Sequence, residues 1–196
     1  RAYNGITYST VTAIAEAVAS IGLHLFTRKF VKKGNKTEVQ VDEVLEHSAL
    51  SLLYYGNRLM THYDLFEATQ SYLDLVGEAF WIILRDGDEP AELWPVRPDW
   101  MKVNPSVKDV VESYTYAPGG MGRDLVKFDP RDVIHFKYFN PLNPYRGKGS
   151  VQAASMAIDI HTFAQEYNRN FFFNSAVPGM VFTTEQKVSK EVIERF

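Results

Sequence analysis

Hydrophobic residues recur at helical spacing near the start of the chain. Thr10 can cap a helix there, and Gly22 stands where a C-terminal glycine would end it. The apolar face of this predicted helix comprises Val11, Ile14, Ala15, Val18 and Ile21. A second helix is predicted over residues 42–53, before the break at Tyr55-Gly56-Asn57.

The clearest helix start in the sequence is at Thr61. Asp64, three residues later, completes a capping-box pattern, and Gly77 marks the expected end of the helix. The helical spacing places six residues on one face: Leu65, Phe66, Thr69, Tyr72, Leu73 and Val76.

Strand-like alternation appears on both sides of the Thr61 helix. Residues 23–26 and 38–41 flank the pair Gly34-Asn35, which predicts a hairpin. A second hairpin is predicted from residues 80–84 and 91–94, joined by Asp86-Gly87-Asp88. Further strands are predicted at 101–103, 113–116, 125–128 and 133–139, with a turn at Gly119-Gly120. The pattern predicts an α+β domain of mixed helices and antiparallel strands.

A different element follows the proline- and glycine-rich loop at residues 140–150. Residues 150–174 hold no proline or glycine, which predicts one long helix of roughly 36 Å, at about 1.5 Å per residue. Heptad-like steps of four and three link Ala153, Ala157, Ile160, Ala164, Tyr167 and Phe171. This stripe is the candidate oligomer interface. The alternative is that it packs on another part of its own chain.

Composition restricts the function. The 196 residues are 45% hydrophobic and suit one globular unit. The absence of cysteine excludes thiolate chemistry and cysteine-based zinc sites, and fits a reducing cytoplasm. A formal charge of −3 argues against a domain whose main task is to hold nucleic acid. No apolar run approaches the roughly 18 residues that span a bilayer, so a soluble protein is expected.

One basic cluster lies on the first predicted hairpin: Arg28, Lys29, Lys32, Lys33 and Lys36. Lysines on an edge strand ordinarily protect that edge and stay solvated. The alternative is a patch for nucleic acid or a partner protein. With an acidic net charge, we expect no tight DNA binding.

No pattern in the sequence predicts catalytic, cofactor or metal chemistry. The five histidines, at positions 24, 47, 62, 135 and 161, lack metal-ligand spacing. Residues 147–150, Gly-Lys-Gly-Ser, fail the phosphate-loop pattern because Gly149 separates the lysine from the hydroxyl residue. Asp86, Asp88 and Glu89 fit a solvated turn, and no nucleophile elbow is present.

Several segments, in order, resemble the HK97 type of bacteriophage portal proteins over nearly the whole chain. They are STVTAIAEAVASIGLHLF, LVGEAFWIILRDGDEPAELWPVRPDWMKV, DPRDVIHFKYFNP and AIDIHTFAQEYNRNFFFNSAVPGMVF. Two departures lie at the ends of the long helix. Gly147-Lys148-Gly149-Ser150 replaces the family's frequent Gly-x-Ser-Pro, and Asn174-Ser175 replaces Asn-Gly.

The resemblance implies an architecture. Residues 1–146 would form the wing, 147–176 the first stem helix and 177–196 the start of the clip. The chain starts with Arg1 in place of methionine and stops inside the helix-like stretch 189–196, so a fragment is expected. By the resemblance, the missing part would hold the rest of the clip, the second stem helix, the tunnel loop and the crown.

The resemblance also implies a function. Family members are non-enzymatic subunits of a head-tail connector, a dodecameric ring at the capsid vertex. They contact terminase, capsid and neck proteins, and double-stranded DNA passes through the ring without sequence-specific binding. The expected location is the capsid vertex of the virion, and the host cytoplasm during assembly. The protein could also be encoded by a prophage. The alternatives are a neck adaptor or a nucleic-acid-processing accessory factor.

Overall fold

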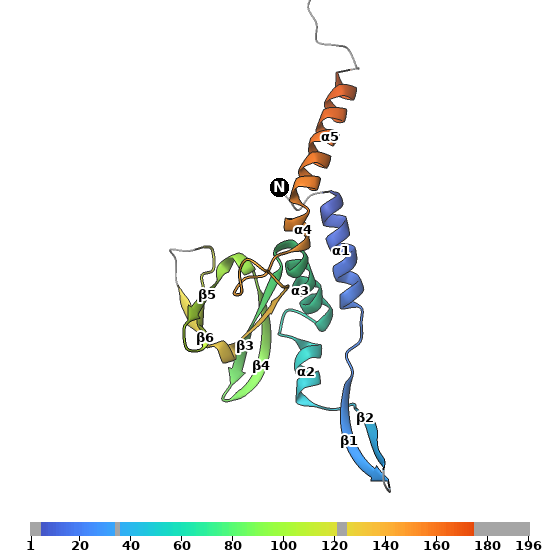
Figure 1. Ribbon diagram of the computed structural model, residues 1–196, viewed down its shortest axis with the longest axis vertical. Helices are drawn as coiled ribbons and strands as arrows, with labels where there is room; N and C mark the ends of the chain where they lie inside the picture. The colour runs from blue at the N-terminus through green and yellow to red at the C-terminus, as the bar shows by residue number, and fades with distance from the viewer. Residues whose placement is uncertain (1–4, 34–35, 121–124, 175–196) are drawn as a thin grey trace, which may run out of the picture. The chain divides into compact units, whose positions relative to one another are not determined.

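The computed structural model describes residues 5–33, 36–120 and 125–174 (Figure 1). Side chains are described over the same ranges except at positions 33, 36 and 37. The chain divides into two compact units, Arg1–Met156 and Ala157–Phe196. The wing, stem and clip boundaries stay predictions. The predicted turn at Gly34-Asn35 and the segment 177–196 lie outside the described residues.

Helix α1 (Ile6–Ala19) begins four residues before the predicted cap, so that prediction is wrong. Thr10 lies inside the helix, where its hydroxyl donates to the carbonyl of Ile6 and does not cap. The buried face follows steps of four, through Thr7, Val11, Ala15 and Ala19. Ile14 and Ile21 of the predicted face are exposed, because the buried stripe is narrower than the apolar pattern.

Helix α2 (Ser48–Tyr55) is shorter than predicted. Residues 42–44 belong to a strand, because β-branched Val39, Val41 and Val44 pair across a hairpin. The helix starts after His47, whose Nδ1 accepts the N–H of Ala49, and ends at the predicted break, Gly56.

Helix α3 (His62–Val76) confirms the capping-box prediction. Asp64 accepts the backbone N–H of Thr61 and its hydroxyl, both at 2.8 Å. The backbone hydrogen bond from Thr61 lowers the pKa of Asp64 below 3.8. Gly77 ends the helix in the left-handed conformation, with φ 85°.

The described strands form three antiparallel sheets, and they include every strand region predicted between residues 23 and 139. Strand β1 (Leu25–Lys33) pairs with β2 (Lys36–Val44) as a separate hairpin. The second sheet has the order β4-β3-β8, from β3 (Glu78–Asp86), β4 (Glu89–Val96) and β8 (Val133–Lys137). The third has the order β5-β6-β7, from β5 (Met101–Ser106), β6 (Val110–Tyr116) and β7 (Val126–Phe128). Strand β8 stops at Lys137, before the predicted residue 139, although the N–H of Tyr138 still bonds to the carbonyl of Gly77.

Strand β3 is the centre of the core, with a cluster on each of its faces. Phe80 packs in one cluster with Met101, Val103, Tyr114 and Val133 from neighbouring strands. Trp81 packs in the other with Leu65 of α3 and Leu93 of β4. The indole N–H of Trp81 donates to the hydroxyl of Thr69 at 2.7 Å, so this buried polar group is satisfied. The predicted α+β class is confirmed.

The prediction of one helix over residues 150–174 is wrong. The structure has α4 (Ser150–Ala153) and α5 (Ser155–Phe173), with Ala154 between them at φ −89° and ψ 2°. Helix α4 contacts α3, and the hydroxyl of Ser150 donates to the carbonyl of Asp74 at 3.3 Å.

Candidate assembly helix and the junction before it

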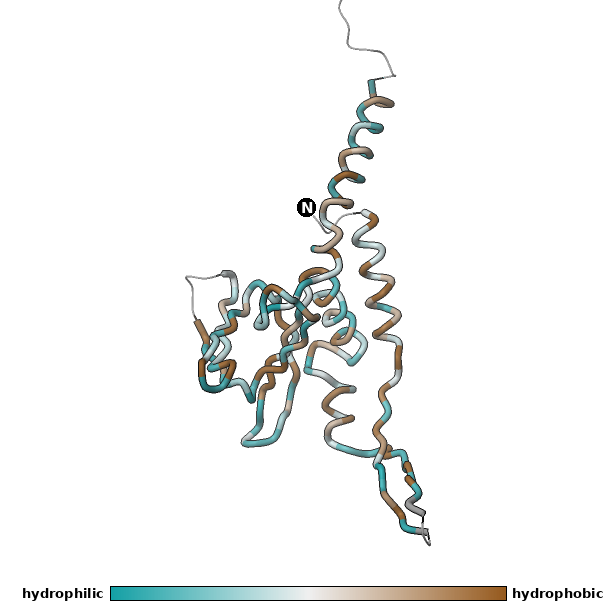
Figure 2. The backbone as a smooth tube through the Cα atoms, viewed as in Figure 1, coloured by the Kyte–Doolittle hydropathy of each residue, from teal (hydrophilic) through white to brown (hydrophobic). Residues whose placement is uncertain are grey.

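Helix α5 has no buried residue along its 19 positions. Apolar segments recur along it (Figure 2). Its exposed fractions are high at Met156 (76%), Ile160 (64%), Phe163 (68%) and Tyr167 (70%). An isolated helix of this length is marginal in water, and packing of an amphipathic face supplies most helical stability in proteins. This face is therefore a candidate protein-contact surface.

The structure places five of the six predicted stripe residues on one face of α5. At about 100° per residue, Ala157, Ile160, Ala164, Tyr167 and Phe171 fall within one arc. The rings of Tyr167 and Phe171 stack with their centroids 6.4 Å apart. Ala153 lies in α4, before the break, and does not continue this regular stripe.

Sequence reasoning missed two large residues of the same surface, Met156 and Phe163. They lie seven positions apart and directly precede Ala157 and Ala164, so they widen the arc on one side. The seven-residue spacing was a signal that could have found them. We call Met156, Ile160, Phe163, Tyr167 and Phe171, with Ala157 and Ala164 at the margin, the α5 apolar face.

A close backbone crossing of three glycines precedes α4. A Cβ atom on Gly147 would lie 1.9 Å from the carbonyl oxygen of Gly77, and one on Gly149 would lie 2.8 Å from the carbonyl oxygen of Asp74. Gly77 also has the positive φ that favours glycine. The Gly-Lys-Gly-Ser segment therefore packs closely against the C-terminal end of α3.

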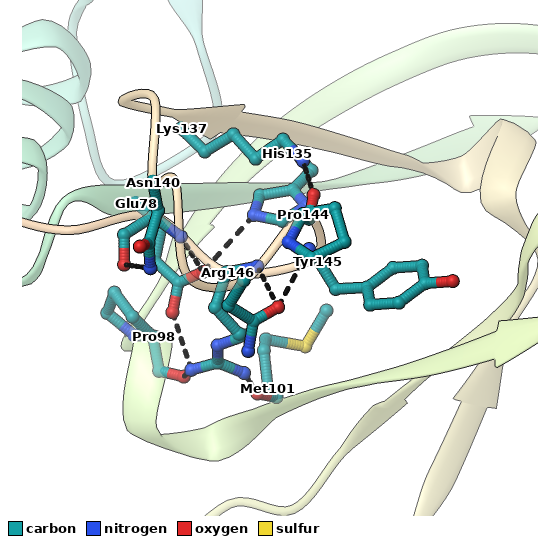
Figure 3. A network of polar contacts seen from close by, with 11 residues as sticks. Glu78, Pro98, Met101, His135, Lys137, Asn140, Pro144, Tyr145 and Arg146 are labelled. Atoms are coloured by element: carbon teal, nitrogen blue, oxygen red, sulfur yellow. Dashed lines mark hydrogen bonds and ion pairs between the residues drawn. The ribbon is translucent and has the colours of Figure 1, made fainter.

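A buried carboxylate fastens the same loop (Figure 3). Glu78 is 3% exposed, and the guanidinium of Arg146 lies 2.5 Å from its Oε1. Its Oε2 is 3.3 Å from Nε2 of His135 and accepts the N–H of Gly147 at 3.3 Å. Arg146 also donates to the carbonyl of Met101 at 2.9 Å. These contacts join β3, β5, β8 and the loop that leads to α4.

His135 is packed inside this network. Its ring stacks on Phe80 with centroids 4.2 Å apart and meets the edge of Tyr114 at 5.9 Å. The arrangement fixes the path of the loop and holds the start of α4.

The predicted basic cluster divides between the two faces of the β1–β2 hairpin. Lys29 lies on one face, 3.6 Å from the carboxylate of Asp42. Arg28 and Lys32 lie on the opposite face. Lys33 and Lys36 pair at the hairpin end, and their side chains are outside the described residues.

None of the described helices is long and apolar enough to cross a membrane. The described histidines and carboxylates form no group of three that could hold a metal ion.

A closed α+β core together with a helix whose apolar face is exposed is typical of a subunit that other proteins complete. The chain belongs to the phage portal protein family, which matches residues 6–196. The resemblance to portal proteins seen in the sequence is thereby confirmed.

Individual relatives agree with the family. The probable portal protein of Streptomyces phage phiC31 is 25% identical over 193 residues, covering 96% of this chain and 40% of the phage protein. A chain in the neck of the gene transfer agent particle is 25% identical in two structures, computed with C6 and C12 symmetry, with TM-scores of 0.71 and 0.69. The match covers 99% and 98% of this chain and 51% and 49% of that one.

A crystal structure of an HK97 family phage portal protein from Corynebacterium diphtheriae is 17% identical, with a TM-score of 0.44. That match covers 70% of this chain and 42% of the other. The chain described here therefore spans half or less of the length of most of these relatives.

Proposed function

We propose that the chain contributes the wing and first stem helix to a structural subunit of an HK97-type portal ring. The ring would lie at the capsid vertex of a virion and form the conduit for DNA packaging and ejection. The observation that carries this proposal is the family match over residues 6–196. The exposed α5 apolar face supports it, because a ring subunit needs surfaces that are covered only on assembly.

The proposed oligomer is a closed ring of twelve copies. The related chain in the gene transfer agent neck occurs in structures computed with C6 and with C12 symmetry, and a ring of twelve copies is compatible with both. A cyclic ring larger than a dimer is built from heterologous contacts, in which two different surfaces of each subunit meet. We assign one of these contacts to the α5 apolar face. Ala157 and Ala164 would let a neighbouring helix approach closely.

The proposed role toward DNA is passage without sequence-specific binding. The net charge of −3 does not favour tight binding to phosphates. On the hairpin, the cation of Lys29 already faces Asp42. The subunit would act without catalysis and would dock terminase, capsid and neck proteins, in the host cytoplasm during assembly and then in the virion.

Native mass spectrometry of the full-length protein tests the proposal. The expected spectrum has one dominant species with twelve subunits, and its mass is unchanged when ATP and magnesium are added. A protein that stays monomeric across all concentrations and salt conditions would contradict the portal assignment.

A further inference from the structure

The β1–β2 hairpin has an apolar face that the described part of its chain leaves uncovered. Residues directly opposite one another in an antiparallel pair share a face. The pairs Phe26↔Glu43, Arg28↔Val41 and Phe30↔Val39 therefore gather four apolar residues on one side. Their exposed fractions are 56% for Phe26, 71% for Phe30, 51% for Val39 and 54% for Val41.

This exposure is costly for so small a sheet. Each strand has nine residues, and the hairpin forms its own two-stranded sheet. A two-stranded hairpin alone is marginally stable in water, and burial of a hydrophobic face is what ordinarily stabilises it. A surface outside the hairpin is therefore expected to cover this face.

The chemistry of the covering surface follows from the cations beside the phenylalanines. Arg28 and Lys32 alternate with Phe26 and Phe30 along β1, on the same face. Neither Arg28 nor Lys32 has an ion-pair partner among the described residues. The matching surface should combine apolar side chains with a rim of carboxylates.

The first unit carries a surface of that kind, at a groove of about 910 Å³ between α2 and β4. Tyr55 and Leu59 line it and are largely exposed, as are the neighbouring residues of the β3–β4 turn. The charged residues that line the groove itself are Arg58 and Glu92, whose Nε and Oε1 lie 3.5 Å apart. The adjoining turn adds three carboxylates that are not part of the lining, those of Asp86, Asp88 and Glu89, directly before the lining residues Pro90 to Glu92. Within the described ranges none of the three has an ion-pair partner.

We propose that the basic, apolar hairpin face of one copy docks in the α2–β4 groove of the next copy around the ring. This inference rests on the proposed portal function. The two surfaces are complementary in charge and both present aromatic and aliphatic side chains to solvent. They are also different surfaces of one chain, which is the requirement for a heterologous contact that closes into a ring.

Directed disulfide formation tests the contact, because the chain has no cysteine. One preparation of the full-length protein carries Phe30→Cys and a second carries Ala91→Cys, both in a cysteine-free background. The two are mixed before assembly and oxidised, and rings are isolated. Covalent dimers are expected only in the mixed rings. The matched control replaces Ala91→Cys by Val107→Cys, an exposed position on the β5–β6 turn, and should give no dimers.

The outcomes separate this inference from the proposed function. Rings that form without the Phe30–Ala91 cross-link, or that give it equally with Val107→Cys, overturn the docking proposal and leave the portal assignment standing. If the unmodified full-length protein forms no rings, both proposals fail.

Charge reversal provides a second readout. Arg28→Glu with Lys32→Glu should lower the yield of the cross-link about tenfold, because like charges then face each other across the contact. Adding Asp88→Lys and Glu89→Lys on the partner preparation should restore the yield. An unchanged yield in the first case, or no recovery in the second, would overturn the assigned pairing.

Discussion

Strand β3 and helix α5 are both rich in large apolar residues, yet they differ in burial: most of the apolar residues of β3 are buried and those of α5 are exposed. The side chains of Phe80, Trp81 and Ile82 are buried from both faces of β3, by other strands and by α3. No residue of α5 is buried. The first half of β3 is therefore buried within the chain, whereas burial of α5 requires contacts beyond the described residues. Apolar content alone does not reveal which of these two situations applies.

The largest expected effect comes from a matched pair of phenylalanine truncations. Phe80→Ala should lower the free energy of unfolding by about 3–5 kcal/mol, because it leaves a cavity in the core. Phe163→Ala should change it by less than about 0.5 kcal/mol in the unassembled protein, because that side chain is exposed. Urea denaturation of the full-length protein in monomeric form measures both. Equal losses of unfolding free energy in Phe80→Ala and Phe163→Ala would contradict the difference between β3 and α5.

The buried carboxylate of the junction should show the next largest effect. Arg146→Ala leaves Glu78 without its cation and should cost about 2–3 kcal/mol of unfolding free energy. Lys127→Ala is the control, since its pair with Glu112 is exposed on both sides and should cost about 0.5 kcal/mol or less. If hydrogen exchange at residues 140–149 stays slow in Arg146→Ala, the guanidinium does not hold the loop.

The glycine crossing gives a third comparison. Gly147→Ala should destabilise the protein by about 1–3 kcal/mol, since its Cβ cannot avoid the backbone of Gly77. Gly22→Ala is the matched variant, because the nearest atom to its Cβ is 3.5 Å away on His24. Thermal denaturation should therefore separate the two, and identical midpoints would contradict the tight crossing.

A smaller effect concerns pH and the start of α3. Because the pKa of Asp64 is lowered on folding, its contribution to stability is present above pH 3.8 and is lost as the pH falls through the lower folded-state value. Asp64→Asn should cost about 0.5–1 kcal/mol at pH 7 and less at acid pH. Circular dichroism during urea titration at pH 7 and pH 3 checks this. A loss of unfolding free energy in Asp64→Asn that is larger at pH 3 than at pH 7 would contradict the prediction.

Local signals were sufficient to predict part of the fold. The capping box at Thr61 and the Asp86-Gly87-Asp88 turn act within a few residues, and α3 and the β3–β4 hairpin follow them. The start of α1 was missed because Thr10 bonds back to Ile6 within the helix, which a cap pattern alone does not distinguish.

Other features depend on residues that are distant in the sequence. Gly147 and Gly149 are required by the backbone near Gly77, which lies about 70 residues earlier, so their spacing could not reveal their role. The contact of Ser150 with Asp74 of α3 joins residues 76 positions apart and had no signal in the local sequence either. On α5 the periodicity placed the stripe but not its full width, since Met156 and Phe163 belong to the same surface.

The central claim is that the core around β3 is buried within the chain, whereas α5 is completed by assembly. Ala157→Leu with Ala164→Leu in the full-length protein tests it most directly, because the added bulk should prevent close helix approach at each of the subunit contacts. Size-exclusion chromatography should then show loss of rings, while the circular dichroism spectrum is unchanged and the monomer's free energy of unfolding in urea stays within about 0.5 kcal/mol of the parent. Intact rings carrying both substitutions would contradict the account.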